Sequence, residues 1–223
     1  MTQVQQKLEQ VTVLFAGDSG DGIQLTGTQF TTNTALFGND LSTFPDFPAE
    51  IRAPLGTIAG VSGFQIHFGS VDIYSPGDRC DVLVVMNAAA LKKNISRLKE
   101  RGTIIVNTSG FDKRNLRLAG IKEVENPLNN HSLEGFKVHE FDITKLTRES
   151  LKDSKLGTKD RDRSKNMFVL GFVYWMYNRK IDSSIDFLKA KFAAKPEILD
   201  ANITVLKAGY HFANSFEYAF SLI

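Results

Sequence analysis

The sequence predicts an α/β protein, with a Rossmann-like three-layer domain, a mostly parallel and possibly mixed sheet, and a helical C-terminal part. Two observations lead to this fold class. An apolar run at Val11–Ala16 is followed by a glycine-rich turn and a helical pattern, which is the opening of a βαβ unit. Further along, apolar runs and helical patterns alternate, as they do in α/β proteins.

The first helix is predicted from apolar or small residues that recur at spacings of four and three. They would lie on one face of the helix, and they are Ile23, Gly27, Phe30, Thr34 and Phe37. Gly27 has no side chain, so the helix should lie close to the sheet. The start of this helix should direct unpaired N–H groups and the positive end of its dipole out of the glycine turn.

The turn itself contains Gly17, Gly20 and Gly22, but it matches no strict nucleotide motif. It lacks the Gly-Lys-Ser/Thr of phosphate loops, and Ser19 stands where a dinucleotide fingerprint has its second glycine. The carboxylates of Asp18 and Asp21 would repel a pyrophosphate unless they point away, and Asp21 has the alternative of capping the helix. A tight turn without a ligand remains the alternative reading.

Leu41–Phe47 is predicted to be the second strand, and a proline-rich loop follows it to Gly60. This loop carries Arg52. Loops at the carboxyl ends of strands line the ligand crevice of open α/β sheets. Arg52 is therefore a candidate contact for a phosphate or carboxylate, with a solvated arginine as the equal alternative.

Val61–Phe68 alternates apolar and polar residues, which is typical of a half-buried strand. Val71–Tyr74 is predicted to form a hairpin with it, which would make the sheet mixed. Cys80–Met86 is a continuous apolar run of the kind found in strands buried on both faces. Asn87, at its end, should cap the next helix, predicted at Ala88–Arg101, or touch a ligand.

Gly102 is predicted to end that helix. The strands expected after it are Thr103–Val106, Ile121–Val124 and Phe136–Phe141. Residues 1–147 would then form the α/β domain. The densely charged residues 148–165 are predicted to be an exposed, mobile connection.

Residues 166–223 are predicted to form a helical part that packs on the same domain or on a partner. Met167–Tyr177 is apolar throughout and should be a helix buried on most sides. A short amphipathic helix is expected at Ile185–Phe192, and Pro196 suits the first turn of the last helix. Two apolar rows with a seven-residue spacing would run along that helix, through Phe212 and Ala213 to Ala219 and Phe220.

Composition excludes several classes of function. The chain has 223 residues, is 42% hydrophobic and carries a formal net charge of +2, so neither nucleic acid nor a membrane is expected as a partner. Its one cysteine, Cys80, allows no intramolecular disulfide and no iron–sulfur cluster held by this chain alone, and it favours a cytoplasmic location. The four histidines show no metal-ligand spacing, and no nucleophile with its base is evident.

Four separated segments, spanning about Val11 to Phe212, resemble the gamma subunit of 2-oxoacid:ferredoxin oxidoreductases. They are the glycine turn GDSGDG, the segment FPDFPAEIRAPLGTIAGVSGFQIHFG, the segment CDVLVVMN and the segment RSKNM. The second is similar to the gamma domain fused at the N-terminus of the alpha subunit in 2-oxoglutarate-type enzymes. In that fused branch, the chain would continue past Ile223 into the thiamine-binding part.

This resemblance implies a role in decarboxylating a 2-oxoacid, passing electrons to ferredoxin and forming an acyl-CoA. Thiamine diphosphate, Mg and iron–sulfur clusters would belong to the complex and not to this chain, with the thiamine site in the alpha and beta parts. The gamma part would help to bind coenzyme A and to assemble the complex. The chain alone should therefore be inactive, with no catalytic or metal-binding residue of its own.

Carried over residue by residue, the resemblance implies a set of coenzyme A contacts in this chain. The set comprises Gly17, Ser19, Gly20, Gly22, Arg52, Asn87 and Asn166. Two departures from the family pattern bear on it: Ser19 replaces a glycine, and Ala53-Pro54 stands where many gamma subunits have Gly-Gly. Two other functions stay open, a stand-alone dinucleotide-binding oxidoreductase and an assembly module without a ligand.

Overall fold

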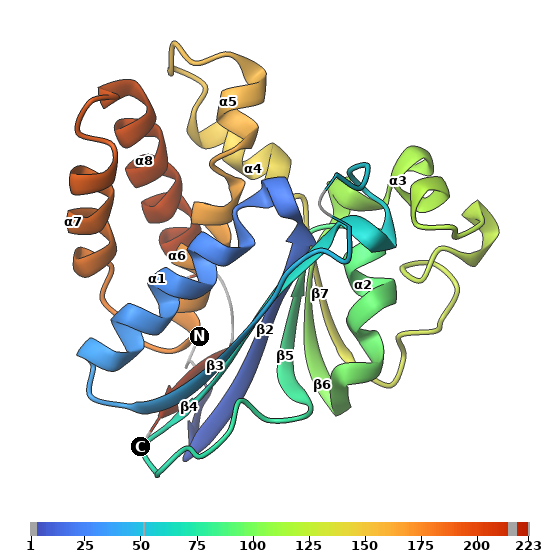
Figure 1. Cartoon of the computed structure of the whole chain (residues 1–223), viewed down its shortest axis with the longest axis horizontal. Helices are drawn as coiled ribbons and strands as arrows, with labels where there is room; N and C mark the ends of the chain where they lie inside the picture. Colours follow the sequence, from blue (N-terminus) through green and yellow to red (C-terminus); the bar gives the residue numbers. More distant parts are fainter. Residues whose placement is uncertain (1–3, 51, 214–217, 223) are drawn as a thin grey trace.

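The computed structural model describes residues 4–50, 52–213 and 218–222 (Figure 1). A six-stranded sheet has the order β3-β4-β2-β5-β6-β7. Its strands are β2 (Gln10–Asp18), β3 (Asp40–Asp46), β4 (Val61–Gly69), β5 (Cys80–Val85), β6 (Leu98–Asn107) and β7 (Lys137–Phe141). The helices are α1 (Ile23–Leu36), α2 (Ala88–Asn94), α3 (Lys113–Leu118), α4 (Ile143–Ser150), α5 (Thr158–Asp162), α6 (Lys165–Met176), α7 (Asp182–Lys191) and α8 (Pro196–Ala213).

Helices cover both faces of this sheet, which confirms the three-layer α/β prediction (Figure 1). Successive residues of β2 point to opposite faces, as the pleat of a strand requires. Val13 and Phe15 join a core formed with α1, α6 and α8. Leu14 and Ala16 join a second core formed with α2 and α3. Both faces of β2 are therefore buried, which explains its continuous apolar run.

The sheet is mixed, as predicted, but not through the predicted hairpin. Strand β4 runs antiparallel to both β2 and β3, whereas β2, β5, β6 and β7 run parallel to one another. The strand prediction at Val71–Tyr74 is wrong. That segment is held instead by a side chain, because the Ile73 N–H donates to Asp40 Oδ2 over 2.7 Å. Both edges of β4, the predicted partner, are already occupied, by β2 on one side and by β3 on the other.

The second helix is shorter than predicted, because strand β6 begins at Leu98. Leu98 pairs with Cys80 and is 4% exposed. The pairing shifts register between Cys80 and Val82, because Cys80 pairs with Leu98 and Val82 pairs with Thr103. Arg101 lies in the extra stretch of β6 between these two pairs and takes a left-handed φ of 59°. Gly102 therefore lies inside the strand and does not end a helix. Ile121–Val124 is also not a strand; it leads into a single 3-10 turn, and Val124 is 85% exposed.

The C-terminal part contains the expected helices but ends differently. All residues of α6 from Asn166 to Met176 are buried, as the apolar run predicts, and Pro196 opens α8. The predicted apolar rows end with α8 at Ala213. Ala219 and Phe220 lie instead in β8 (Tyr218–Leu222), which pairs with β1 (Val4–Leu8) in a separate parallel two-stranded sheet. A backbone segment that pairs with β1 cannot extend the helix.

The charged residues 148–165 include the end of α4, all of α5 and the first residue of α6. Two hydrogen bonds of 2.7 Å each join the guanidinium of Arg148 to the carboxylate of Asp162. The division into residues 1–147, 148–165 and 166–223 stays a prediction, as does the mobility of the middle segment. No helix in the described ranges is long and apolar enough to cross a bilayer.

Candidate functional site

The glycine turn lies where β2 meets α1. A 3-10 turn, Ser19–Asp21, follows the strand, and Gly22 then takes a left-handed φ of 72° as the N-cap of α1. A glycine adopts that conformation without strain. No side chain caps this helix, and no acidic residue lies in its first turn. Its first N–H groups and the positive end of its dipole are thus directed at whatever lies beyond the turn.

The two aspartates of the turn are occupied by the protein itself. Both carboxylate oxygens of Asp18 accept from the Gly56 N–H, each at 3.0 Å. Asp21 accepts from the Asp18 N–H through Oδ2 and pairs through Oδ1 with Lys165 Nζ at 2.8 Å. Asp21 therefore caps the 3-10 turn, not α1. Both negative charges are engaged with groups of the protein, which reduces the repulsion expected from them.

Burial is the main influence on the titration of Asp18, whose residue surface is 8% exposed. Desolvation raises the pKa of its carboxyl above the ordinary value, and the hydrogen bond from Gly56 opposes that effect. Asn87 adds a weaker opposing hydrogen bond to the same carboxyl. Asn87 Oδ1 also accepts from the Ala90 N–H at 2.8 Å, so it caps α2, one of the two roles predicted for it.

The loop that carries Arg52 lies against the glycine turn. The Gly56 N–H is bound to Asp18, and a Cβ built on Gly20 would be 3.9 Å from Leu55 Cδ2. Arg52 itself is exposed. In the described part of the chain, its guanidinium makes no hydrogen bond or ion pair. The structure thus brings the two predicted loops together and leaves Arg52 available.

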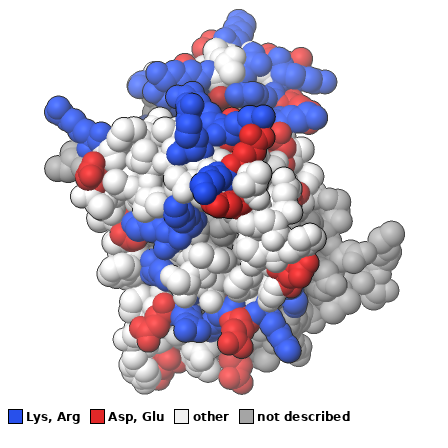
Figure 2. Space-filling view, turned by 90° about the vertical axis from the view of Figure 1, so that its right-hand side faces the viewer, with Lys and Arg blue, Asp and Glu red and all other residues white. Residues whose placement is uncertain are grey.

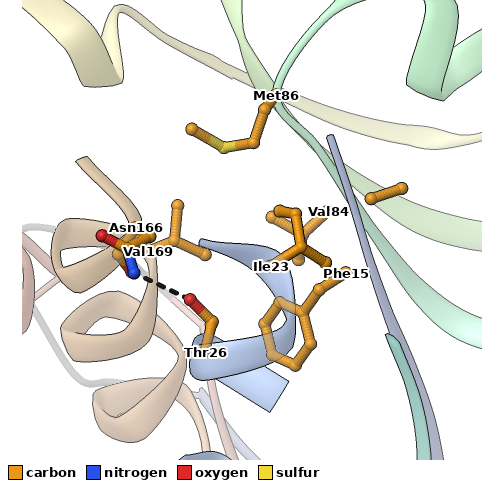
Figure 3. Close-up of a pocket in the computed structure, with 8 residues that line it drawn as sticks. Phe15, Ile23, Thr26, Val84, Met86, Asn166 and Val169 are labelled. Atoms are coloured by element: carbon orange, nitrogen blue, oxygen red, sulfur yellow. Dashed lines mark hydrogen bonds between the residues drawn. The ribbon is translucent and has the colours of Figure 1, made fainter. Parts of the chain in front are cut away.

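The space beneath the turn is closed. Its lining side chains come from β2, α1, β5 and α6 (Figure 3), and the gap between them is too small for a water molecule. A Cβ on Gly17 would lie 2.9 Å from Asp21 Oδ2 and 3.0 Å from Met86 Cβ. Gly17 therefore meets a packing requirement. Any ligand of the turn must lie outside it, not between β2 and β5.

Asn166 supports the turn from the start of α6. Its Nδ2 donates to the Gly22 carbonyl at 3.5 Å, and the Thr26 hydroxyl donates to the Asn166 carbonyl at 3.5 Å. A Cβ on Gly22 would come within 2.5 Å of Asn166 Nδ2. The N-termini of α1 and α6 therefore lie in contact.

A cavity of about 290 Å³ opens on the outer side of this contact. It is bordered by the glycine turn and the first turn of α1, the junction of α5 and α6, the residue that follows α7, and residues of α8. The lining residues are Gly20, Gly22, Leu25, Asp160, Arg163, Ser164, Asn166, Phe192, Ile198 and Asn202. We call this space the turn cavity. It brings together three of the predicted contacts, Gly20, Gly22 and Asn166, and leaves Gly17, Ser19, Arg52 and Asn87 out of its lining.

The turn cavity is lined by the starts of two helices and by one charge of each sign, Arg163 and Asp160. Helix α6, like α1, begins without a side-chain cap, and Gly22 and Ser164, the N-cap residues of the two helices, both line the cavity. Ser164 is 3% exposed, and within the described ranges its hydroxyl has no hydrogen-bond partner. Arg163 stands at the rim, 2.9 Å from Asp160. Figure 2 views the α3 side, across the sheet from this cavity, and shows Lys and Arg gathered at the upper end, to which the parallel strands point in Figure 1.

The prediction of contacts missed Arg163, Ser164 and Asn202. The first two lie in the family-like segment RSKNM, so that segment was the available signal. Nothing in the sequence indicated Asn202, which reaches the cavity only because α8 packs on α6. Within the described residues, no group of three or more His, Cys, Asp or Glu side chains is placed to hold a metal ion.

Known proteins share both the sequence and the fold. The chain is 51% identical over 212 residues to the 2-oxoglutarate oxidoreductase subunit KorA of Mycobacterium tuberculosis, and the match covers 95% of this chain and 32% of KorA. It is 25% identical to the ketoisovalerate oxidoreductase subunit VorA of Methanothermobacter marburgensis, over 93% of this chain and 37% of VorA. The chain spans about a third of the length of these curated relatives.

Two solved structures show the same fold. One is the 2-oxoglutarate:ferredoxin oxidoreductase of Magnetococcus marinus, determined with 2-oxoglutarate, coenzyme A and succinyl-CoA bound; its TM-score is 0.71 at 24% identity, over 97% of this chain and 33% of that one. The other is a keto/oxoacid ferredoxin oxidoreductase gamma subunit from Geobacter sulfurreducens, with a TM-score of 0.60 at 16% identity, over 93% and 98% of the two chains.

The family assignment rests on a match across most of the sequence. The family model described as pyruvate ferredoxin/flavodoxin oxidoreductase covers residues 12–212, which include both the glycine turn and the turn cavity. The chain belongs to the pyruvate ferredoxin/flavodoxin oxidoreductase family.

Proposed function

We propose that this chain is the gamma-type domain of a 2-oxoglutarate:ferredoxin oxidoreductase and that its turn cavity binds the anionic part of coenzyme A. Two comparisons support the proposal. The relative with 51% identity is named as a 2-oxoglutarate oxidoreductase subunit, and the Magnetococcus enzyme, which has the same fold, was determined with coenzyme A bound.

The observation that carries the proposal is the meeting of two uncapped helix N-termini at one cavity. Backbone N–H groups at helix starts bind phosphate well, because the groups are unpaired and the helix dipole favours negative charge. Coenzyme A carries a diphosphate. The hydroxyl of Ser164 and the guanidinium of Arg163 would add donors, and Lys165 already neutralises Asp21.

The size of the cavity limits how much of the ligand this chain holds. At about 290 Å³, it is at the lower end of small-molecule sites, which measure roughly 300–1,000 Å³. It suits the phosphates and leaves the rest of coenzyme A to reach a neighbouring polypeptide. Arg52, on the loop bound to Asp18, is free to approach that second portion.

The redox groups belong to neighbouring polypeptides in this proposal. The one cysteine, Cys80, is fully buried in β5, so its thiolate cannot serve a cluster at the surface. Thiamine diphosphate and Mg in the alpha and beta parts would supply the decarboxylation, and iron–sulfur clusters would carry electrons to ferredoxin. This chain would bind and orient the acyl acceptor and help to assemble the complex, in the cytoplasm.

Calorimetry with the purified chain tests ligand binding directly. We expect coenzyme A to bind, and Arg163→Ala or Arg52→Ala to weaken it about tenfold, as the loss of one charge-assisted hydrogen bond would. Arg79→Ala is the matched control, because Arg79 is exposed in the turn before β5. Coenzyme A affinity that is unchanged by both Arg163→Ala and Arg52→Ala would refute the site.

The same titration separates the rival functions. A stand-alone dinucleotide-binding oxidoreductase would bind NAD or NADP more tightly than coenzyme A, although Ser19 takes the place of a fingerprint glycine. An assembly module without a ligand would give no heat with any of them. Decarboxylation of 2-oxoglutarate by the purified chain alone would contradict the division of roles.

A further inference from the structure

The turn cavity contains an ion pair that stands in the way of an anionic ligand. Arg163 Nη1 lies 2.9 Å from Asp160 Oδ1, and the two side chains are 64% and 46% exposed. Both residues line the cavity, and Asp160 is the one acidic side chain among the described residues of that lining. In the free protein, the guanidinium that would hold a phosphate is therefore already bound to a carboxylate of the same chain.

The pair forms because of where its two residues stand along the chain. They are three residues apart, a spacing that brings side chains together on the surface of a helix. Asp160 lies in the first turn of α5, and Arg163 is the C-cap of that helix. The next residue, Ser164, is the N-cap of α6. Arg163 thus lies where the short helix α5 ends and the longer helix α6 begins.

The start of α6 is an unfavourable place for an unpaired cation. Helix α6 has 12 residues and no side-chain cap, and Arg163 precedes its N-cap, so the charge of Arg163 lies near the positive end of the helix dipole. A negative charge at this point is favourable. Asp21 cannot supply it, because Asp21 Oδ1 is 2.8 Å from Lys165 Nζ. In the free protein, Asp160 therefore supplies the negative charge that a phosphate of the ligand would bring.

The contact between Arg163 and Asp160 is one that a phosphate can displace. Among the described residues, the guanidinium of Arg163 donates to Asp160 through Nη1 alone, which leaves Nε and Nη2 unpaired. A phosphate can accept two parallel hydrogen bonds from one guanidinium, and such paired bonds are stronger than a single one. Exposed ion pairs contribute little to stability, so Arg163 can exchange one anion for the other at a small cost.

On the basis of the proposed function, we propose that Asp160 sets the affinity of the turn cavity: it holds Arg163 in the free protein, and the anionic part of coenzyme A must displace its carboxylate in order to bind. An acyl-CoA product carries the same phosphates as coenzyme A. The competing carboxylate therefore also weakens the hold on the product, and the return of Arg163 to Asp160 accompanies product release.

Calorimetry with the purified chain and coenzyme A tests this competition. Asp160→Asn should bind coenzyme A about threefold to fivefold more tightly than the wild type, because an exposed ion pair no longer has to be broken. Asp160→Glu keeps the charge and should bind like the wild type. Asp153→Asn is the matched control, because Asp153 is exposed in the same charged segment but lines a different groove, beside α8. Since the expected result is a gain of affinity, a misfolded variant cannot produce it.

The Arg163→Ala background separates this competition from a general effect of charge. In that background, Asp160→Asn should change coenzyme A affinity by less than about twofold, because the carboxylate has no guanidinium to hold and salt screens direct repulsion between exposed charges. Dissociation provides a second measurement. In stopped-flow experiments with the fluorescent etheno analogue of coenzyme A, the wild type should release the analogue faster than Asp160→Asn does.

Three results would overturn the role of Asp160 while coenzyme A still binds. Equal affinity of Asp160→Asn and the wild type would show that the carboxylate does not compete. Weaker binding by Asp160→Asn would mean that the ion pair positions Arg163 for the ligand. An equal gain of affinity with and without Arg163 would assign the effect to charge alone. A wild-type chain that does not bind coenzyme A at all would refute the proposed function itself, and this role with it.

Discussion

Gly171 of α6 and Gly209 of α8 mark the point where these two helices touch backbone to backbone. A Cβ on Gly171 would lie 2.0 Å from the Leu206 carbonyl oxygen, and one on Gly209 would lie 2.0 Å from the Phe168 carbonyl oxygen. Since real Cβ atoms do not come so close, the helices can adopt this separation only with glycine at both positions. The crossing also holds Asn202 and Ile198 of α8 against the turn cavity.

Gly209→Ala should therefore destabilise the protein. Overpacking usually costs about 1–3 kcal/mol, and here the methyl group meets backbone, which cannot rotate away. For a chain of this size, that range corresponds to a fall in melting temperature of roughly 2–12 °C. Thermal unfolding followed by circular dichroism measures the change. Gly157→Ala is the control, because Gly157 has a φ of −65° and no atom lies near its Cβ position. The melting temperature of the Gly157→Ala variant should equal that of the wild type.

Asp18→Asn should flatten part of the pH dependence of stability. Burial raises the pKa of the Asp18 carboxyl above its ordinary value of 3.8, so the folded state holds this proton more tightly than the unfolded state. The wild type therefore loses stability as the pH rises from 3.8 through the raised pKa, and the amide does not.

Urea unfolding of both proteins at several pH values above 3.8 measures this difference. The free energy of unfolding of the wild type, minus that of Asp18→Asn, should decrease as the pH rises. Asp78→Asn, at an exposed turn position, supplies the matched comparison. A difference that increases with pH would mean that the hydrogen bond from Gly56 outweighs desolvation at Asp18.

The fold was predictable where one local pattern agreed with the tertiary structure. The absence of a side chain at Gly27 predicted close packing on the sheet, and a Cβ there would lie 2.1 Å from the Phe64 ring. The errors arose where pairing with a distant strand decides the structure. Leu98 continues a helical pattern, yet it pairs with Cys80; Phe220 continues an apolar helical row, yet it lies in a strand that pairs with β1.

The residues of the site show the same contrast between what a local sequence pattern predicts and what tertiary packing decides. Gly20, Gly22 and Asn166 were identified from sequence motifs, and the structure places all three at the turn cavity. Their contact with a ligand stays a prediction. The closed floor beneath Gly17 could not be predicted, because it depends on how the Met86 and Val169 side chains, far apart in the chain, fill the same space (Figure 3).

Removing Lys165 should weaken ligand binding indirectly. Lys165→Met leaves the Asp21 carboxylate without its partner beside the cavity, and the two side chains are only 22% and 12% exposed. We expect coenzyme A affinity to fall about tenfold, and the double variant Asp21→Asn with Lys165→Met to recover most of it, because the negative charge is then gone.

Calorimetry with the wild type, the two single variants Asp21→Asn and Lys165→Met, and the double variant measures the coupling between Asp21 and Lys165. The pair Lys189–Asp186, exposed on α7 at 3.1 Å, provides the control, and its disruption should leave the affinity unchanged. If Lys165→Met binds coenzyme A as tightly as the double variant, the lysine does not act by neutralising Asp21.

Limited proteolysis should cut the charged connection before any other part of the chain. Lys152 and Lys155 are exposed between α4 and α5, outside regular helix, whereas Lys189 and Lys191 are exposed within α7. Trypsin requires a locally unfolded substrate, so the first pair should be cleaved sooner. The two fragments should still elute together in gel filtration, because α6 and α8 share one apolar core with β2 and β4. Arg148→Ala, which removes the bond to Asp162, should accelerate the first cut. Earlier cleavage within α7, or separation of the fragments, would contradict residues 148–165 as the mobile connection of a single packed unit.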